Sequence, residues 1–139
     1  MKKFVCSINI LLACLLSISC ATSKISEQRK NYLKEQYKNV PVESAVFTSD
    51  NDYYLYLDLL DNLAVAFAEN SKEMACDPKC VSMNEDEYWN ELLKRIEPQK
   101  TEFVQFCSRH YMMTGGTDAS IKQNWYPLSI KLRNEIKCH

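Results

Sequence analysis

Residues 49–80 constrain the fold more than any other part of the sequence. Their apolar side chains recur at intervals of three and four, the spacing that puts side chains on one face of an α-helix. The members of this stripe are Tyr53, Tyr56, Leu57, Leu60, Leu63, Ala64, Phe67, Ala68, Met74 and Ala75. Leu55 and Leu59 widen the stripe beyond the roughly 100° of an ordinary surface helix. We therefore expect a central helix, with neighbours on more than one side.

Both ends of this helix can be placed from the sequence. Ser49, followed three residues later by Asp52, matches the capping-box pattern, and the acidic side chain also suits the positive end of the helix dipole. Pro78 cannot continue a helix, because it lacks the amide donor and its ring clashes with the preceding turn. The chain is thus expected to turn between Cys76 and Cys80, which puts both thiols at the C-terminal end of the helix.

The same helix carries a second, polar strip. Its members are Asp58, Asp61, Asn62, Glu69 and Lys72. Charged side chains on a helix usually face water, so this strip predicts a narrow solvent-exposed face on an otherwise buried helix.

The first 21 residues resemble a bacterial export signal. Two lysines follow Met1, a mostly apolar run extends from Phe4 to Ile18, and small residues come next. The apolar run is shorter than the roughly 20 residues that span a bilayer, which disfavours a permanent transmembrane helix. We expect residues 1–19 to be a signal peptide.

Two cysteines in this leader stand in sequences that resemble the bacterial lipobox. Residues 11–14 match that motif closely and end at Cys14, whereas residues 17–20 match it less well and end at Cys20. Cleavage before Cys14 would leave Leu15 and Leu16 in the mature chain, while Cys20 is followed at once by polar residues typical of a lipoprotein tether. Lipidation is therefore expected at Cys20, with Cys14 as the alternative and a signal-peptidase cut after Ala21 as a third route.

The resemblance to lipoproteins implies a location. An acyl group, such as palmitate, on Cys20 would anchor the chain to a bacterial envelope membrane, at the outer membrane or facing the periplasm. Cleavage after Ala21 would instead give a soluble exported protein. Removing Lys2 and Lys3 leaves 15 basic residues against 18 acidic ones, a net charge of -3. A nucleic-acid partner, which needs a basic surface, is therefore not expected.

Cysteine parity agrees with lipidation at Cys20. It leaves Cys76, Cys80, Cys107 and Cys138, an even set that suits two disulfides in an oxidising compartment. A bond between Cys76 and Cys80 would close a tiny loop and constrain the unfolded chain little, so long-range pairings are expected. Cys76 with Cys107 is preferred, since both lie on apolar faces of neighbouring helices.

The remaining segments also read as mainly helical. Residues 22–39 are polar and form either a solvated helix or a flexible tether, and residues 40–47 carry Pro41, which favours an extended path across the surface. Ser82 and Glu85 match a second capping box before an apolar pattern that Pro98 ends. Another helix over residues 101–114 meets two glycines, both expected where positive φ is needed.

The C-terminal segment, residues 117–139, is open to two interpretations. A helix is one; alternation over residues 128–132 makes a short strand the other. The expected fold is all-α, a small disulfide-stapled bundle of about four to five helices around the long one. In domain terms, residues 20–48 form a polar tether and helical or extended lead-in, and residues 49–139 form a single helical domain.

Few residues carry recognisable chemistry. Cys107 and His110 are one helical turn apart, the minimum for an activated thiol, although a half-cystine beside an ordinary histidine is the simpler reading. The cysteine spacing is not that of zinc modules, so neither metal nor cofactor is expected. Aromatic residues are abundant, and Tyr54, Trp125 and Tyr126 do not fit the inward-facing patterns. Exposed aromatics are enriched at binding hot spots, which makes these three candidate partner contacts.

These observations favour a non-enzymatic, lipid-anchored envelope protein that binds another protein, as an inhibitor, immunity or exclusion factor does. The alternatives are an envelope enzyme or thiol-active protein that uses Cys107 with His110, and a structural envelope component. A thiol count separates the second hypothesis from the others, because a catalytic cysteine must be free.

Acylation at Cys20 can be tested directly. The mature N-terminal peptide should be an acylated Cys20, because the polar tether begins immediately after it. Mass spectrometry of the exported chain measures this. A free terminus at Thr22 would remove the lipid anchor, and an acylated Cys14 would overturn the parity argument.

Overall fold

The structure, a computed structural model, describes residues 24–39, 47, 49–112 and 115–138. The leader with Cys14 and Cys20, and the segment 40–46, lie outside these residues. Every regular element in the described part of the chain is a helix, and these are α2 (Glu27–Gln36), α3 (Asp50–Ala75), α4 (Pro78–Val81), α5 (Glu85–Arg95), α6 (Glu97–Arg109) and α7 (Asp118–Glu135). The expected all-α fold is confirmed.

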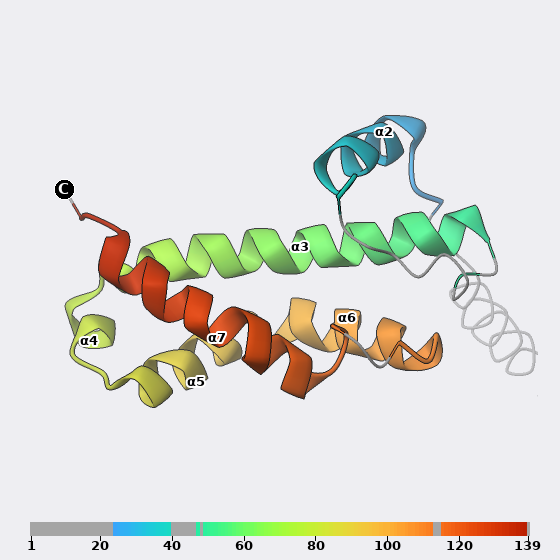
Figure 1. Ribbon diagram of the computed structural model, residues 1–139. Coiled ribbons are helices and arrows are strands. Elements are labelled where there is room, and N and C mark those ends of the chain that lie inside the picture. The colour runs from blue at the N-terminus through green and yellow to red at the C-terminus, as the bar shows by residue number, and fades with distance from the viewer. Residues whose placement is uncertain (1–23, 40–46, 48, 113–114, 139) are drawn as a thin grey trace, which may run out of the picture.

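The long helix α3 is the axis of the molecule (Figure 1). Its 26 residues correspond to a length of about 39 Å. Ser49 caps it as expected, since its hydroxyl oxygen accepts a hydrogen bond from the Asp52 amide at 3.2 Å. Leu57, Leu63 and Met74 are completely buried along its length. This burial agrees with the wide apolar stripe in the sequence.

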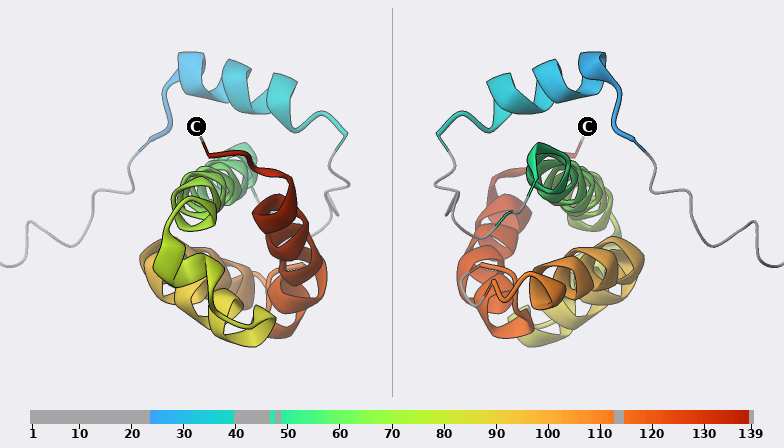
Figure 2. Two further views of the ribbon diagram at one scale, coloured as in Figure 1. Left: turned by 90° about the vertical axis from the view of Figure 1, so that its left-hand side faces the viewer. Right: turned by 90° about the vertical axis from the view of Figure 1, so that its right-hand side faces the viewer.

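Three rods surround a common core. The consecutive helices α5 and α6 run back along α3, and α7 then returns in the direction of α3, so that the end-on views show a three-sided bundle (Figure 2). The most extensive contacts of α3 are with α6 and α7. The helix α2 lies on the opposite side of α3, away from α5 and α6 (Figure 1).

The second helix cap differs from the expected one. Asn84, not Ser82, caps α5: its side chain accepts from the Glu87 amide at 2.9 Å, and the Glu87 carboxylate accepts from the Asn84 amide at 3.1 Å. Ser82 instead ends α4, where its hydroxyl donates to the Lys79 carbonyl at 2.8 Å. The sequence pattern did not predict the short helix α4. Because Ser82 is the C-cap of α4, the N-cap of α5 lies two residues later, at Asn84.

Of the two interpretations of the C-terminal segment, the helix is confirmed and the short strand is wrong, because residues 128–132 belong to the uninterrupted helix α7. Helical spacing brings Ile121, Trp125, Ser129 and Leu132 to one side, and all four are buried or half-buried. A strand would have separated them. Pro127 lies within α7 and removes one backbone donor there without ending the helix.

The two glycines serve different purposes. Gly115 has a φ of 81° and so adopts the expected left-handed conformation. Gly116 instead lies so close to Cys107 that a Cβ atom would overlap the thiol side chain. The left-handed position directly after α6 is taken by Tyr111, with a φ of 56°. A non-glycine residue in this conformation carries a backbone cost of order 1 kcal/mol or more.

One disulfide joins the ends of the bundle's first and last long helices. Cys76 pairs with Cys138, 62 residues further on, with a Cα–Cα distance of 5.4 Å. The general expectation of a long-range bond is therefore met, but the preferred pairing of Cys76 with Cys107 is wrong. Among the described residues, Cys80 and Cys107 are buried free thiols, so a second disulfide is not formed.

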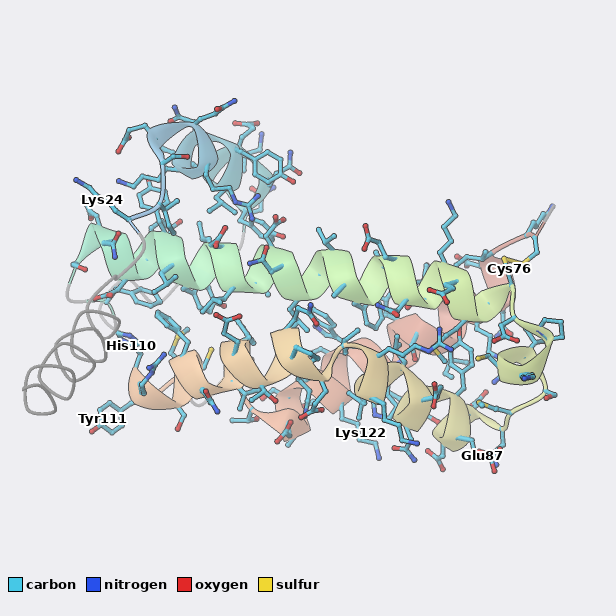
Figure 3. The ribbon with its side chains drawn as sticks, turned by 180° about the vertical axis from the view of Figure 1, so that it is seen from behind. Lys24, Cys76, Glu87, His110, Tyr111 and Lys122 are labelled. Carbon is cyan, nitrogen blue, oxygen red and sulfur yellow. A yellow bond between two sulfur atoms is a disulfide. The ribbon has the colours of Figure 1, made fainter. Side chains whose placement is uncertain are left out.

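Helix direction explains why Cys107 cannot reach Cys76. The C-terminal end of α6 lies beside the start of α3, where the Phe106 ring is 6.5 Å from that of Tyr56. Cys76 follows Tyr56 by 20 residues, which is about 30 Å along the helix. Figure 3 shows His110 and Cys76 at opposite ends of the molecule. A disulfide needs Cα atoms within about 7 Å, so of the two distant cysteines only Cys138, which follows α7 beside the C-terminal end of α3, can reach Cys76.

The disulfide should contribute strongly to stability. Replacing Cys138 with alanine should lower the free energy of unfolding by about 2 to 5 kcal/mol, because the bond closes a long loop in the unfolded chain. Denaturant melts measure this. A reductant should destabilise the unmodified chain to a similar extent and leave Cys138→Ala unchanged. A peptide map that joins Cys76 to Cys80 or to Cys107 would contradict this pairing.

Candidate functional site

The polar strip of α3 is partly covered by α2. Asp61, expected in water, is only 6% exposed. The Arg29 side chain of α2 reaches both acids of this region: its Nε donates to Asp58 Oδ1 at 2.6 Å, and a terminal nitrogen donates to Asp61 Oδ2 at 2.8 Å. The Tyr37 hydroxyl donates to the other Asp61 oxygen at 2.6 Å. We call these four residues the α2 clamp.

The clamp affects the protonation of its members. Burial by itself lowers the pKa of the Arg29 guanidinium, but its hydrogen bonds to Asp58 and Asp61 outweigh that effect and raise it. For Tyr37, burial first and the hydrogen bond to Asp61 second raise the pKa of the phenol well above its usual value. Arg29 therefore stays charged and Tyr37 stays neutral, the states that their hydrogen bonds require.

Apart from the clamp, α2 has little apolar surface with which to dock. Leu33 is its one buried residue, and it is completely buried in the core cluster. Lys30 pairs with the exposed Glu27 within α2 at 2.9 Å, and its largely covered side chain also brings its amine to the Tyr54 ring of α3. The position of α2 thus depends on one leucine and on the charged hydrogen bonds of the clamp.

Beside the clamp, a groove of about 660 Å³ opens between α2, α3 and α6. Its size is within the usual range for small-molecule and peptide side-chain sites. Its walls are Arg29 and Tyr32 of α2, Asp58, Asp61, Asn62, Val65, Ala66 and Glu69 of α3, and Gln99 and Glu102 of α6. We call this the α2–α3–α6 groove.

The groove is rich in acceptors. Its four carboxylates against one guanidinium give a formal charge of -3. Glu69 and Glu102 are exposed and form no ion pair with any described residue. The Gln99 side-chain oxygen is buried and has no hydrogen-bond partner in the described part of the chain. Buried polar atoms are normally satisfied, so this oxygen is an exception in the wall of the groove.

The groove also exposes apolar surface. Val65 and Tyr32 are each 45% exposed, and the Arg29 guanidinium lies 5.1 Å from the centre of the Tyr32 ring. Protein interfaces combine an aromatic-rich apolar centre with a polar rim, and the groove has both kinds of surface. The groove is therefore the candidate functional site.

The aromatic residues expected to bind a partner lie elsewhere. The Trp125 ring meets Phe67 edge-on at 5.0 Å, and the Tyr126 ring meets Trp89 edge-on at 5.7 Å. Tyr54 is half-buried beside Tyr53, with the Lys30 amine 5.4 Å from its ring centre. All three pack against the core, so they do not form one exposed aromatic patch.

The candidate thiol and imidazole, Cys107 and His110, both lie in apolar surroundings. Burial raises the pKa of the Cys107 thiol to about 11, which leaves very little thiolate at neutral pH. The His110 ring lies against Phe106, with the ring centres 4.3 Å apart, and also near Phe47 at 5.8 Å. These contacts use the imidazole as an aromatic packing group.

Sequence reasoning missed the exposed residues Tyr32, Val65 and Tyr111. Tyr111 is 88% exposed, because helix α6 ends before it. Val65 could have been found, since it interrupts the polar strip at helical spacing between Asn62 and Glu69. Tyr32 is an aromatic side chain in an otherwise polar segment, which is a weaker signal.

No three His, Cys, Asp or Glu side chains of the described residues gather as a metal site would require. None of the described helices combines the length and apolarity needed to cross a membrane. Neither family models, nor curated proteins, nor solved structures give a match to this chain.

The α2 clamp can be tested by removing its cation. Arg29→Ala leaves the nearly buried Asp61 without its charged partner, and should lower stability by about 1 to 3 kcal/mol. Amide hydrogen exchange should quicken in α2 while the centre of α3 stays protected, because α2 can detach from the bundle. Arg109→Ala, at an exposed arginine of α6, is the matched control and should leave exchange in α2 unchanged. Equal protection of α2 in both variants would contradict the clamp.

Proposed function

We propose that this chain is an exported protein, anchored to a bacterial envelope membrane through a lipid on Cys20, that acts by binding another protein. Inhibitors, immunity factors and exclusion factors act in this way. The observation that carries the proposal is the α2–α3–α6 groove, where exposed Val65 and Tyr32 stand beside carboxylates without partners among the described residues. Exposed apolar side chains and carboxylates are sufficient for binding a protein, without any catalytic group.

The position of Lys24 supports a membrane-proximal domain. Cys20 precedes Lys24 by four residues, which span at most about 14 Å even when fully extended. Lys24 lies at the end of the bundle that also holds His110 and Tyr111 (Figure 3). With a lipid on Cys20, this end would face the membrane and the side of the bundle would remain open to a partner.

The groove lies on that side of the bundle rather than at its membrane-facing end. Its residues of α3 run from Asp58 to Glu69, the middle of the helix. A partner in the periplasm or in the same membrane could therefore reach it. The arrangement favours binding over the thiol-active alternative, because Cys107 is buried and its pKa is raised.

Photo-crosslinking from inside the groove tests the proposal. A photoreactive amino acid at Val65, in cells that produce the full chain, should give a defined adduct with an envelope protein. Val81 is the matched control: it is also a valine, is 46% exposed against 45% for Val65, and lies outside the groove. Its adduct should be weak or absent.

Two further outcomes would count against the proposal. Equal adducts from Val65 and Val81 would indicate chance encounters, and no adduct from either would favour a purely structural role. Cys20→Ser should release the protein from the membrane fraction. Retention of Cys20→Ser in that fraction would contradict the lipid anchor.

A further inference from the structure

We infer that the α2–α3–α6 groove binds a basic segment of its protein partner and receives an arginine side chain. This inference rests on the proposed binding function and specifies the chemistry of the partner. It is argued from the charges, the open acceptors and the apolar wall of the groove.

The groove keeps a net negative charge after its internal ion pairs are counted. Arg29 is shared between Asp58 and Asp61, and the neutral Tyr37 adds a hydrogen bond but no charge. The clamp therefore keeps one negative charge. Glu69 on α3 and Glu102 on α6 add two more from different walls of the groove. Charge complementarity across an interface favours a cationic partner and disfavours an acidic one.

The carboxylates that line the groove can only accept hydrogen bonds. Besides the clamp, the charged groups of the groove that lack partners among the described residues are the Glu69 and Glu102 carboxylates, and both accept hydrogen bonds. A ligand must therefore bring several donors. A guanidinium carries five N–H donors and no acceptor, and it pairs with carboxylates in a planar, two-bond geometry.

The groove also has an apolar wall. Val65 and the Tyr32 ring are each 45% exposed and belong to different helices that line the same groove. Arginine and lysine cover apolar surface with their methylene stems while the charged head reaches polar groups. The Tyr32 ring already has the Arg29 guanidinium near it at 5.1 Å, which shows that the ring accepts a cation. An arginine stem over Val65, with its head between the glutamates, would use all three features.

The experiment uses the full chain, purified in mild detergent after export, and a synthetic hexapeptide that contains two arginines. Binding is measured by fluorescence anisotropy at physiological salt, where exposed charges more than about 8 Å apart are largely screened. A citrulline hexapeptide keeps the shape and removes the charge, and a lysine hexapeptide keeps the charge and removes the planar fork. We expect arginine to bind best, lysine more weakly and citrulline at least about tenfold more weakly.

Paired charge variants locate the binding. The double variant Glu69→Gln/Glu102→Gln should weaken the arginine peptide at least about tenfold, because it removes the two open carboxylates. The control Glu73→Gln/Glu135→Gln makes the same change in net charge, with one residue a turn further along α3, and should weaken it by less than about twofold. All four glutamates are exposed, so both variants should fold.

Three results would overturn the inference. These are equal weakening by the two double variants, equal binding of the citrulline peptide, and no binding of the arginine peptide at millimolar concentration. Sedimentation adds a fourth: self-association that Glu69→Gln/Glu102→Gln abolishes would make the occupant a second copy of this chain. Each of these could occur while Val65 still crosslinks an envelope protein, so failure of this inference is distinguishable from failure of the proposed function.

Discussion

The structure depends on covering α3 from several sides. Its apolar surface is too wide for a single neighbour, and a single helix cannot bury two or three faces by itself. The chain solves this with α5 and α6 on one side and α7 on another, so that Leu57, Leu63, Phe67 and Met74 are all removed from water. Each of these side chains contributes roughly 1.5 to 3 kcal/mol when fully buried. The positions of the other helices follow from this requirement.

The disulfide fixes the result at one end. Since α7 returns in the direction of α3, the two C-terminal ends meet, and Cys76 can reach Cys138. The opposite end has no disulfide in the described residues and is held by aromatic packing, with Phe47, Tyr56 and Phe106 within contact distance of one another. Cys107 lies against Gly116 in the same packing, and burial raises the pKa of its thiol.

The outer face of α3 follows a different rule. It carries acids, and α2 covers part of it with a single buried leucine and a charged clamp. A helix docked mainly through Leu33, Arg29 and Tyr37 leaves the neighbouring acids without partners in the described part of the chain. That incomplete coverage is what creates the α2–α3–α6 groove. α6 packs against one side of α3, and α2 covers only half of its outer face. The exposed Val65 therefore lies in the same groove as the Glu69 and Glu102 carboxylates.

The sequence by itself determined the elements whose signals are local. The apolar spacing of α3, its cap at Ser49, the turn before Pro78 and the left-handed conformation of Gly115 all follow from a few neighbouring residues, and the structure has each of them. The polar strip containing Asp58, Asp61 and Glu69 was also visible. These features depend on helix periodicity and backbone conformation, which a short stretch of chain specifies.

Tertiary structure alone decided the rest, because it depends on which distant segments meet. Cys76 pairs with Cys138 rather than Cys107 because α6 and α7 run in opposite directions, and no local pattern states that direction. Trp125 and Tyr126 looked free until α7 packed them on Phe67 and Trp89. The sequence pattern predicts a solvent-exposed Asp61, but Arg29, which is 32 residues earlier in the chain, pairs with it and helps to bury it. The groove exists only because α2 and α6 flank the same strip of α3, and long-range packing sets that arrangement.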